Sequence, residues 1–507
     1  MKKENRHFLL YSLLLAFVFL AVCSKSSFLY PFNDWYDAND FLTLGKGMLH
    51  GLVPYRDLYE QKGPILYAAH ALCALVPGPA FLGVYFLEVG ALTCFLYHMS
   101  KIIRLYLRPA AAYGILPVLC ALLLSAESFC QGDSAEELCA ALLAVTLYHT
   151  LAYFREYQGR PMPYGILLID GVLAGCILWV KYTLLGFHLA YMAMLFFLCV
   201  KDRKLLRGIK SCFVFLGGMA VPTVPVLLYF AGNHALGNLF QVYFYNNIFL
   251  YDSEKSAGIA SLLLTILLRT GDTFLRNIQF SVFTILGVAG FLLSRRFLSG
   301  RGKIVLAAEA ILLAFFVYTG SNFPYYGYIF SIFPVLGFVA LGSSIGSLLE
   351  KLPRKDLLPQ TMGGHFPKML PEALLAIICL VFAYYKSPNT ADIGKSPDSL
   401  VQYQFAAIIN ESEQPTLLNY GFLDAGFYTA ADVLPTEKYF QMQNISYESF
   451  PEMMDAQDAC VREQRVEYVV VRGEEVPAFM LEYYTPVQEA RQTYEGAHVL
   501  YTLLRKK

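Results

Sequence analysis

Apolar runs long enough to cross a lipid bilayer recur along the first three quarters of this chain. A spanning helix needs about 20 mostly apolar residues, because the hydrocarbon core is about 30 Å thick and a helix rises about 1.5 Å per residue. Since 56% of the 507 residues are hydrophobic and only 15% are charged, one soluble core could not bury all the apolar side chains. The sequence therefore predicts an α-helical polytopic membrane protein.

The lengths of the runs predict about eleven transmembrane helices. They lie at 8–28, 82–100, 109–126, 135–153, 163–180, 183–200, 211–231, 278–294, 304–320, 328–348 and 369–385.

The distribution of Lys and Arg predicts how the chain is oriented. Basic residues resist translocation and therefore mark cytoplasmic loops. If residues 1–7 lie in the cytoplasm, the loops on that side hold twenty-one Lys and Arg residues, against eight on the other side outside the C-terminal region. We therefore expect a multi-pass protein of the cell (plasma) membrane with a cytoplasmic N-terminus and an extracytoplasmic C-terminus.

Two apolar stretches need a separate interpretation. Residues 64–78 are too short to span and are followed by Pro79, and counting them as a span would place the later basic clusters outside. We interpret them as a helix on the outer membrane surface. The first run ends in Leu-Ala-Val-Cys, which also resembles a lipoprotein signal, but the bulky Val22 favours a retained helix.

Composition excludes several functional classes. The formal net charge is zero and no segment forms a dense basic stripe, so no nucleic-acid partner is expected. The eleven cysteines fall mostly in apolar runs without repeated CxxC spacing, which indicates core residues rather than a metal or redox site.

The composition turns polar from about residue 390. Segments 416–421 and 466–473 are typical of short buried strands, and 450–464 is typical of a helix. We therefore predict two domains, a transmembrane domain at 1–388 and a small extracytoplasmic α/β domain at 389–507.

Acidic residues gather in the first two predicted outer loops, at 29–81 and 127–134 and just beyond. They are Asp34, Asp37, Asp40, Asp57 and Glu60, then Glu127, Asp133, Glu136 and Glu137. The simplest interpretation is that they are solvated charges and helix caps: Asp37 for the helix predicted after it, and Asp133 or Ser134 for the next span. Their concentration in short loops fixed by Pro and Gly also suggests a site.

Carboxylates beside fixed cations at a membrane surface suit the transfer of a sugar from a lipid phosphate. A general base must reach the attacking hydroxyl, and Asp or Glu can do so. The departing phosphate gains negative charge, which cations stabilise strongly away from bulk water. Arg56, Lys62 and Lys181 are placed for that role.

Residues 37–67, DANDFLTLGKGMLHGLVPYRDLYEQKGPILY, resemble the first outer loop of bacterial membrane glycosyltransferases of the GT-C superfamily, the group similar to protein O-mannosyltransferases and the lipid A aminoarabinose transferase. The shared pattern is an Asp opening the loop, then G-x-x-P-Y-R-D, then K-G-P. Looser similarity continues in QGDSAEELCAALLAVTLY, GVLAGCILWVKYTLL, FYNNIFLY and NYGFLDAGFYTAADVLPTEKYF. Adjacent Asp-Glu opens the loop in the mannosyltransferases, whereas Ala38 follows Asp37 here. Where related members carry a His-Tyr pair, this chain reads Gly327-Tyr328.

The resemblance implies an inverting glycosyltransferase that uses a polyprenyl-phosphate-linked sugar donor and a cell-envelope acceptor. The implied catalytic residues are Asp37 as base with Asp57 and Glu136 as orienting groups, and the implied substrate-binding residues are Tyr55, Arg56, Glu60, Lys62, Glu137, Lys181 and Tyr328. No cofactor is certain, and a divalent metal is possible.

Three further acids, Glu88, Asp170 and Glu309, fall inside predicted spans, where an ionisable residue is by default a functional candidate. Their scatter and the absence of an internal repeat do not favour a proton-coupled transporter. The alternative to an enzyme is a non-catalytic transporter or scaffold for lipid-linked glycans.

Overall fold

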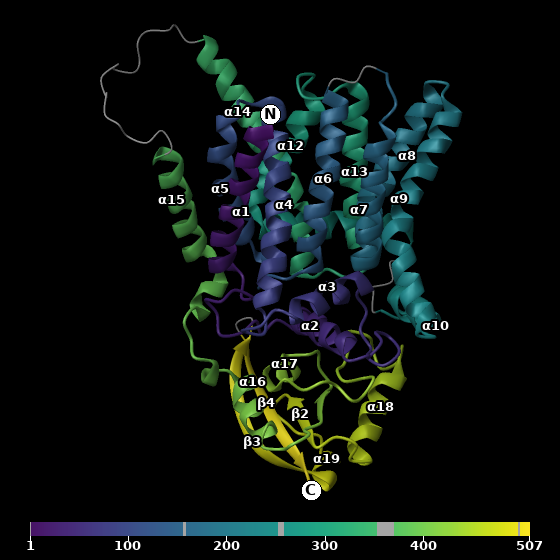
Figure 1. The fold of residues 1–507 in the computed structure, drawn as a ribbon, viewed down its shortest axis with the longest axis vertical. Helices are drawn as coiled ribbons and strands as arrows, with labels where there is room; N and C mark the ends of the chain where they lie inside the picture. Colours follow the sequence, from purple (N-terminus) through teal and green to yellow (C-terminus); the bar gives the residue numbers. More distant parts are fainter. Residues whose placement is uncertain (1, 156–158, 252–257, 352–369, 495–496) are drawn as a thin grey trace.

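The computed structural model describes the chain except residues 1, 156–158, 252–257, 352–369 and 495–496. Figure 1 shows a helical bundle at one end and a sheet domain at the other, with a layer of short helices between them. The N-terminus lies at the far end of the bundle and the C-terminus at the far end of the sheet domain. Of the basic residues used to predict orientation, Lys255, Arg354, Lys355 and Lys368 lie outside the described residues.

Each of the eleven predicted apolar runs coincides with a helix. They are α1 (Lys2–Cys23), α4 (Leu82–Tyr106), α5 (Ala110–Leu124), α6 (Ala135–Arg155), α7 (Tyr164–Lys181), α8 (Gly186–Lys201), α9 (Leu205–Gly232), α12 (Ile278–Leu293), α13 (Gly300–Tyr318), α14 (Pro334–Lys351) and α15 (Leu370–Lys386).

By length and hydropathy alone, five of the described helical segments could cross a membrane, or six if the bent pair at 324–348 is one span. One of the five, Tyr164–Lys201, contains both α7 and α8. The chain reverses between α7 and α8, as shown by the hydrogen bond of 2.8 Å that Tyr191 of α8 donates to Asp170 of α7. The protein is therefore a multi-pass membrane protein, and the count of eleven spans stays a prediction.

Two predicted ends of spans were wrong. The first helix ends at Cys23 and does not continue to residue 28, because serine side chains bind the backbone there: Ser27 Oγ donates to the carbonyl of Ala21 at 2.6 Å. The tenth run begins as a 3₁₀ segment, η4 (Pro324–Ile332), and α14 starts only at Pro334. The axes of η4 and α14 meet at a bend of 42°.

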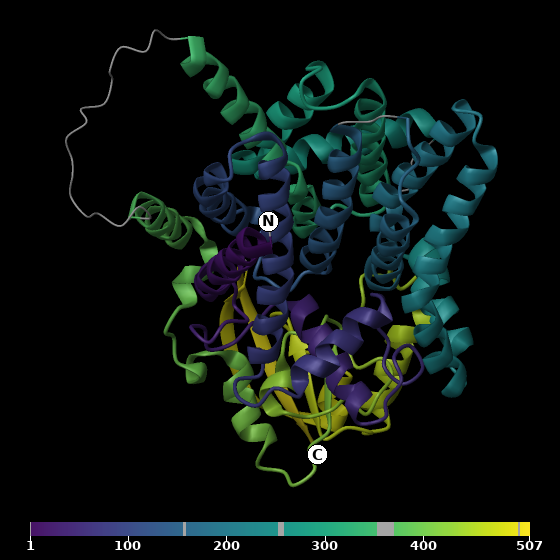
Figure 2. The same ribbon diagram turned by 45° about the horizontal axis from the view of Figure 1, so that its top comes forward.

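The layer between the bundle and the sheet domain contains α2 (Tyr36–Leu49) and α3 (Pro64–Ala74), which lie beside the sheet domain in Figures 1 and 2. Within the stretch 64–78, α3 has 11 residues and packs against α2, α4 and α7, and its place on the outer membrane surface stays a prediction. The expected cap at Asp37 was wrong: Trp35 is the N-cap of α2, without a side-chain cap bond. Ser134 does cap α6, accepting from Glu137 N at 3.0 Å.

Three more segments lie between α9 and α12 along the chain: α10 (Leu236–Leu239), the π-helical η3 (Phe240–Leu250) and α11 (Ile259–Arg276). None of the three was predicted as a helix, and η3 contains the FYNNIFLY segment except its last residue, Tyr251.

The sheet domain is built on four strands in the order β1-β2-β4-β3. The first pair is parallel and the other two are antiparallel. Its elements are α16 (Val401–Ile409), β1 (Leu417–Tyr420), α17 (Phe427–Ala431), α18 (Pro451–Arg462), β2 (Tyr468–Arg472), α19 (Met480–Tyr483), β3 (Tyr484–Tyr494) and β4 (Ala497–Lys506). The predicted strands at 416–421 and 466–473 and the predicted helix at 450–464 are confirmed, whereas the long β3–β4 pair was not predicted.

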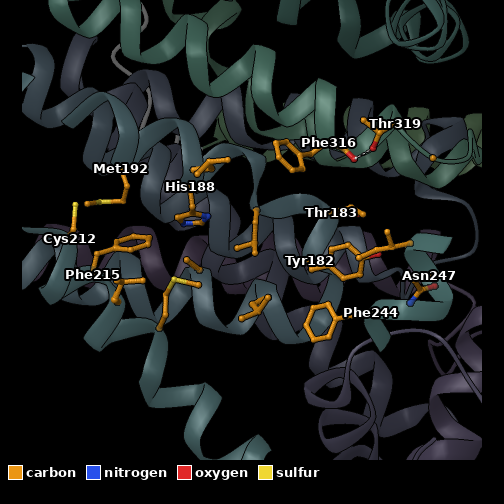
Figure 3. Close-up of a pocket in the computed structure, with 18 of the residues that line it drawn as sticks. Tyr182, Thr183, His188, Met192, Cys212, Phe215, Phe244, Asn247, Phe316 and Thr319 are labelled. Carbon is orange, nitrogen blue, oxygen red and sulfur yellow. Dashed lines mark hydrogen bonds between the residues drawn. The ribbon is translucent and has the colours of Figure 1, made fainter. Parts of the chain in front are cut away.

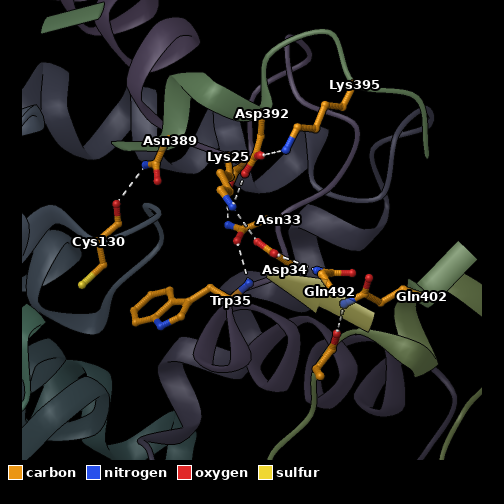
Figure 4. Close-up of polar contacts among 12 residues, drawn as sticks. Lys25, Asn33, Asp34, Trp35, Cys130, Asn389, Asp392, Lys395, Gln402 and Gln492 are labelled. Carbon is orange, nitrogen blue, oxygen red and sulfur yellow. Dashed lines mark hydrogen bonds and ion pairs between the residues drawn. The ribbon is translucent and has the colours of Figure 1, made fainter. Parts of the chain in front are cut away.

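A buried lysine ties the sheet domain to the bundle (Figure 4). Lys25 Nζ contacts Asp34 Oδ1 at 2.8 Å and Asp392 Oδ2 at 2.7 Å. Gln492 of β3 donates to the other oxygen of Asp34 at 3.0 Å. Nearby, Asn389 donates to the carbonyls of Cys23 and Cys130. The end of α1, both outer loops and the sheet domain therefore meet in one polar cluster.

A second contact joins the sheet domain to α2 and predicts a pH effect on stability. Thr43 donates to the buried Asp424 at 2.7 Å, and burial raises the pKa of Asp424 from 3.8 to about 6. The folded protein therefore holds this proton more tightly than the unfolded chain, so the stabilisation is fully present below about pH 4 and is lost as the pH rises through 6. We expect a loss on the order of 3 kcal/mol between pH 4 and 7, measured as the difference in thermal unfolding between the unchanged protein and Asp424→Asn. Identical pH profiles for the two proteins would contradict this.

The two ends of the bundle allow the predicted orientation to be tested by labelling. A cysteine replacing the exposed Glu413 of the sheet domain should react with a membrane-impermeant maleimide in intact cells. Lys201 is the last residue of α8 and lies at the same end of the bundle as the N-terminus of the chain. A cysteine replacing it should react only after permeabilisation. The unchanged protein, with its eleven cysteines, gives the background. The reverse pattern would overturn the orientation.

Candidate functional site

The first outer loop folds back on itself so that Lys62 faces the bundle mouth. Tyr55 adopts a left-handed backbone with a φ of 69°, which is uncommon for a residue with a side chain. Tyr55 N donates to Leu58 O at 2.7 Å, and the buried Tyr55 hydroxyl donates to the carbonyl of Lys62 at 2.6 Å. The Pro-Tyr-Arg-Asp turn thus fixes the backbone that carries Lys62.

A glycine lets this loop reach the end of α7. Gly63 N donates to the carbonyl of Val180 at 3.0 Å. A Cβ at position 63 would lie 2.0 Å from the carbonyl oxygen of Trp179, so a side chain there would push the loop away. The Lys-Gly-Pro sequence therefore brings Lys62 beside Lys181, which is the last residue of α7.

Each lysine is paired with a carboxylate from another element. Lys62 Nζ lies 3.1 Å from Asp37 Oδ2 of α2. Lys181 contacts Glu136 of α6, and its ammonium lies 3.6 Å from the centre of the Tyr326 ring. A buried charge is costly unless it is paired and hydrogen-bonded, so these partners allow both cations to remain in a largely buried site.

The surroundings of Lys62 keep it charged. Burial alone lowers the pKa of Lys62, but Asp37 and Glu60 beside it raise that pKa well above its usual value. Burial also raises the pKa of Glu60 and, strongly, that of Asp40 behind it. The neighbouring carboxylates thus favour the charged form of the Lys62 ammonium.

A cavity of about 110 Å³ lies against these charges. The bundle, the first outer loop and the sheet domain all contribute to its wall. The lining residues are Asp37, Gln61, Lys62, Val180, Lys181, Tyr182, Thr183, Tyr243, Asn247, Tyr251, Val317, Gly320, Ser321, Tyr325, Tyr326, Leu423, Gln443 and Asn444. We call it the charged cavity.

A larger groove of about 800 Å³ adjoins it (Figure 3). It lies among α7, α8, α9, η3 and α13, and side chains such as Met192, Phe215 and Phe316 make its wall mostly apolar. Five residues line both spaces: Tyr182, Thr183, Asn247, Tyr251 and Gly320. The apolar groove therefore leads into the charged cavity.

Four of the predicted site residues meet here, namely Asp37, Lys62, Lys181 and, behind Lys181, Glu136. Arg56 and Asp57 do not join them. Asp57 is held in a two-bond pair with Arg56 at 2.7 and 2.8 Å and accepts from Val53 N, while Arg56 also donates to Asn233 O at 2.8 Å. Hydrogen bonds from Arg56 lower the pKa of Asp57. Neither residue lines the cavity or the groove, so the geometry gives them a role in holding the loop turn.

The other predicted substrate-binding residues also support the loops. Glu60 is buried and accepts from Lys62 N at 2.6 Å and from the Tyr67 hydroxyl. Glu137 accepts from Asp133 N at 3.1 Å. Tyr328 is buried and packs against Phe129 of the second outer loop. Like Tyr55, none of them lines the charged cavity.

The three acids within spans bind neighbouring helices. Glu88 accepts from Ser24 Oγ and from Asp133 N at 3.0 Å, which anchors the second outer loop. Asp170 accepts from Tyr191 and from His149, both at 2.8 Å. Glu309 accepts from Thr150 at 2.7 Å. In the structure these contacts give the three acids a role in joining neighbouring helices and loops.

The structure also shows site residues that the sequence did not predict. Tyr325 and Tyr326 were not singled out, although aromatic side chains beside an outer loop are a usable signal. Gln61 adjoins a predicted residue, but a single Gln carries no pattern. Gln443 and Asn444 come from the sheet domain, far away in sequence, and only the fold brings them here.

Within the described residues, no group of three or more His, Cys, Asp or Glu side chains is arranged to hold a metal ion. The cationic side chains among the described lining residues are Lys62 and Lys181, and metal dependence stays an open prediction.

No family model and no curated protein matches this sequence. Solved structures do match: ArnT from Cupriavidus metallidurans in the apo state (TM-score 0.59) and bound to undecaprenyl phosphate (TM-score 0.58). Both are 13% identical, and each match covers 98% of this chain and 97% of ArnT. The chain has the ArnT fold. At the level of fold, the predicted resemblance to GT-C membrane glycosyltransferases is therefore confirmed.

Arabinofuranosyltransferase AftD from Mycobacteria also matches, at 12% identity over 99% of this chain and 40% of its own, with a TM-score of 0.45 that is too low to add to the comparison.

The buried pair of Glu136 and Lys181 predicts a specific pattern of stability. Lys181→Met leaves Glu136 buried without its cation and should cost about 3–5 kcal/mol of unfolding free energy. The double variant with Glu136→Gln removes the unpaired charge and should recover most of that loss. Thermal unfolding in detergent measures both. If the double variant is no more stable than Lys181→Met alone, the loss of stability does not come from the unpaired charge of Glu136.

Proposed function

We propose that this protein is an integral-membrane inverting glycosyltransferase that moves a sugar from a polyprenyl-phosphate-linked donor to a cell-envelope acceptor on the extracytoplasmic face. One observation carries the proposal: an apolar groove of about 800 Å³ opens into a cavity lined by two lysines and an aspartate. A prenyl phosphate has the same division into a long apolar chain and an anionic end. The ArnT structure with undecaprenyl phosphate supports this choice of ligand class.

The lysines are suited to hold the phosphate of the donor. Their ammonium groups reach the charged cavity from two directions, Lys62 from the first outer loop and Lys181 from the end of α7. Cations in a nearly closed site stabilise a developing phosphate charge more strongly than cations in water do. The binding of both substrate and leaving group thus depends on the same two side chains.

Asp37 is the acid placed for general base catalysis. Of the residues that the structure describes, it is the only Asp or Glu that lines the charged cavity, and it lies in the first turn of α2. In the proposed step, Asp37 takes the proton of an acceptor hydroxyl while the hydroxyl oxygen bonds to the anomeric carbon. The bond from that carbon to the phosphate oxygen breaks, and its electron pair stays on the phosphate beside the lysines. A single displacement of this kind inverts the anomeric configuration.

Asp37→Asn tests the base. The change keeps the shape of the side chain and removes its ability to take a proton. We expect the rate to fall about 10²- to 10⁴-fold, with protein level and affinity for the donor little changed. Release of undecaprenyl phosphate from a sugar-loaded donor, measured by thin-layer chromatography of labelled lipid, gives the rate.

Asp57→Asn is the matched control in the same loop. Because Asp57 binds Arg56 and Val53 N away from the cavity, this variant should lose some stability and keep its rate per folded molecule within about threefold. An inactive but folded Asp57→Asn beside a normally active Asp37→Asn would reverse the assignment of the base.

The alternative is a non-catalytic transporter or scaffold for lipid-linked glycans. Such a protein would use the lysines to hold the phosphate but would need no base. It predicts no loss of sugar from the donor in the unchanged protein, so the same chromatography separates the two functions.

A further inference from the structure

Two buried glutamines beside the charged cavity have side-chain atoms without a partner. Gln61, next to Lys62, is 5% exposed, and neither its Nε2 nor its Oε1 makes a hydrogen bond with another described group. Gln443, from the loop between α17 and α18, is 7% exposed, and its Nε2 is likewise unbonded. Both residues line the charged cavity. A buried polar atom left unpaired costs free energy, so partners supplied by a ligand would be favourable here.

These amides come from opposite sides of the cavity. Gln61 belongs to the first outer loop and is fixed by its neighbours, since its own carbonyl accepts from Asn247 at 2.8 Å. Gln443 belongs to the sheet domain, and its backbone N contacts the sulfur of Met453 at 3.4 Å. Any group that binds both amides therefore touches the bundle side and the sheet domain at once.

The charges already present decide what kind of group this is. Among the described residues, the charged ones that line the cavity are Asp37, Lys62 and Lys181. The proposed function assigns Asp37 to the acceptor hydroxyl, so none of these described lining residues offers a carboxylate to a cationic group on the sugar. The phosphate of the donor would occupy the lysines. What remains for the rest of the ligand is a set of neutral donors and acceptors, which match hydroxyl groups.

We propose, resting on the function proposed above, that Gln61 and Gln443 bind the hydroxyls of an uncharged donor sugar, so that the sheet domain completes the sugar site and the enzyme prefers neutral sugars over amino sugars. A site built to bond a hydroxyl rejects a ligand that leaves its buried polar groups unpaired. The two glutamines are thus specificity-determining residues rather than catalytic ones.

The experiment compares binding of three kinds of lipid to the full-length protein in detergent. The probes are undecaprenyl phosphate alone, undecaprenyl phosphate carrying glucose, galactose, mannose or arabinose, and undecaprenyl phosphate carrying 4-amino-4-deoxyarabinose. We expect at least one neutral sugar donor to bind about tenfold or more tightly than the bare lipid, and the amino-sugar donor to show no such gain.

Gln61→Met and Gln443→Met keep the length of the side chain and remove its hydrogen bonds. Each should reduce the neutral-sugar preference about three- to tenfold, while binding of bare undecaprenyl phosphate stays within about twofold and shows that the protein is folded. Gln443→Glu should raise affinity for the amino-sugar donor relative to the neutral one, an effect that a purely structural role would not produce.

Gln441→Met is the matched control. Gln441 is buried in the same loop and accepts from Asp424 N at 2.6 Å, but it does not line the cavity. Its replacement should lower stability and leave the sugar preference unchanged.

The outcomes separate this inference from the function on which it rests. If no polyprenyl phosphate binds at all, the proposed function fails and this inference fails with it. If the bare lipid binds but Gln61→Met and Gln443→Met keep the full sugar preference, or the unchanged protein prefers the amino sugar, this inference alone is overturned. Loss of the preference in Gln441→Met as well would attribute the effect to the loop and would overturn it too.

Discussion

The site depends on pairing two lysines, Lys181 buried and Lys62 partly buried, with carboxylates at the mouth of the bundle. The partners matter because an unpaired buried ion costs several kcal/mol. Each partner comes from a different element: Asp37 from α2 and Glu136 from α6. The pairing therefore requires the first outer loop, α2, α6 and α7 to reach their positions together, and it leaves two cations facing a single cavity.

The sheet domain packs on the layer of short helices and also contributes residues to the lining of the charged cavity. Thr43 of α2 bonds to Asp424, and Lys25 joins the end of α1 to Asp392 on the way into the domain. Through these contacts Gln443 and Asn444 are brought to the cavity that Asp37 lines from the other side. The lining of the charged cavity therefore includes residues of the sheet domain, whereas the residues of the apolar groove come from the bundle. This division allows the proposed lipid end and the proposed sugar end to be tested separately.

Much of this architecture was predictable because bilayer thickness sets the length of spans. The eleven apolar runs all form helices, and the stretch 64–78 forms only the short helix α3. The loop pattern pointed to Asp37 and Lys62. It also pointed to Arg56 and Asp57, which the structure uses to hold the turn, because sequence proximity cannot show which way a turn directs a side chain. The strand β3 escaped prediction because most of its residues are exposed and many are polar. Gln443 escaped because its role depends on a contact between distant parts of the chain.

The most direct measurement is a cryo-EM structure of the full-length protein with undecaprenyl phosphate. We predict that the prenyl chain follows the groove between α7, α9 and α13, past Phe215 and Phe316, and that the phosphate lies within hydrogen-bond distance of both Lys62 and Lys181. Asp37 should remain beside the phosphate, and its oxygen Oδ1, which is not the one that contacts Lys62, should be free to bind an acceptor hydroxyl. A phosphate bound elsewhere, with the groove and the charged cavity unoccupied, would contradict the account.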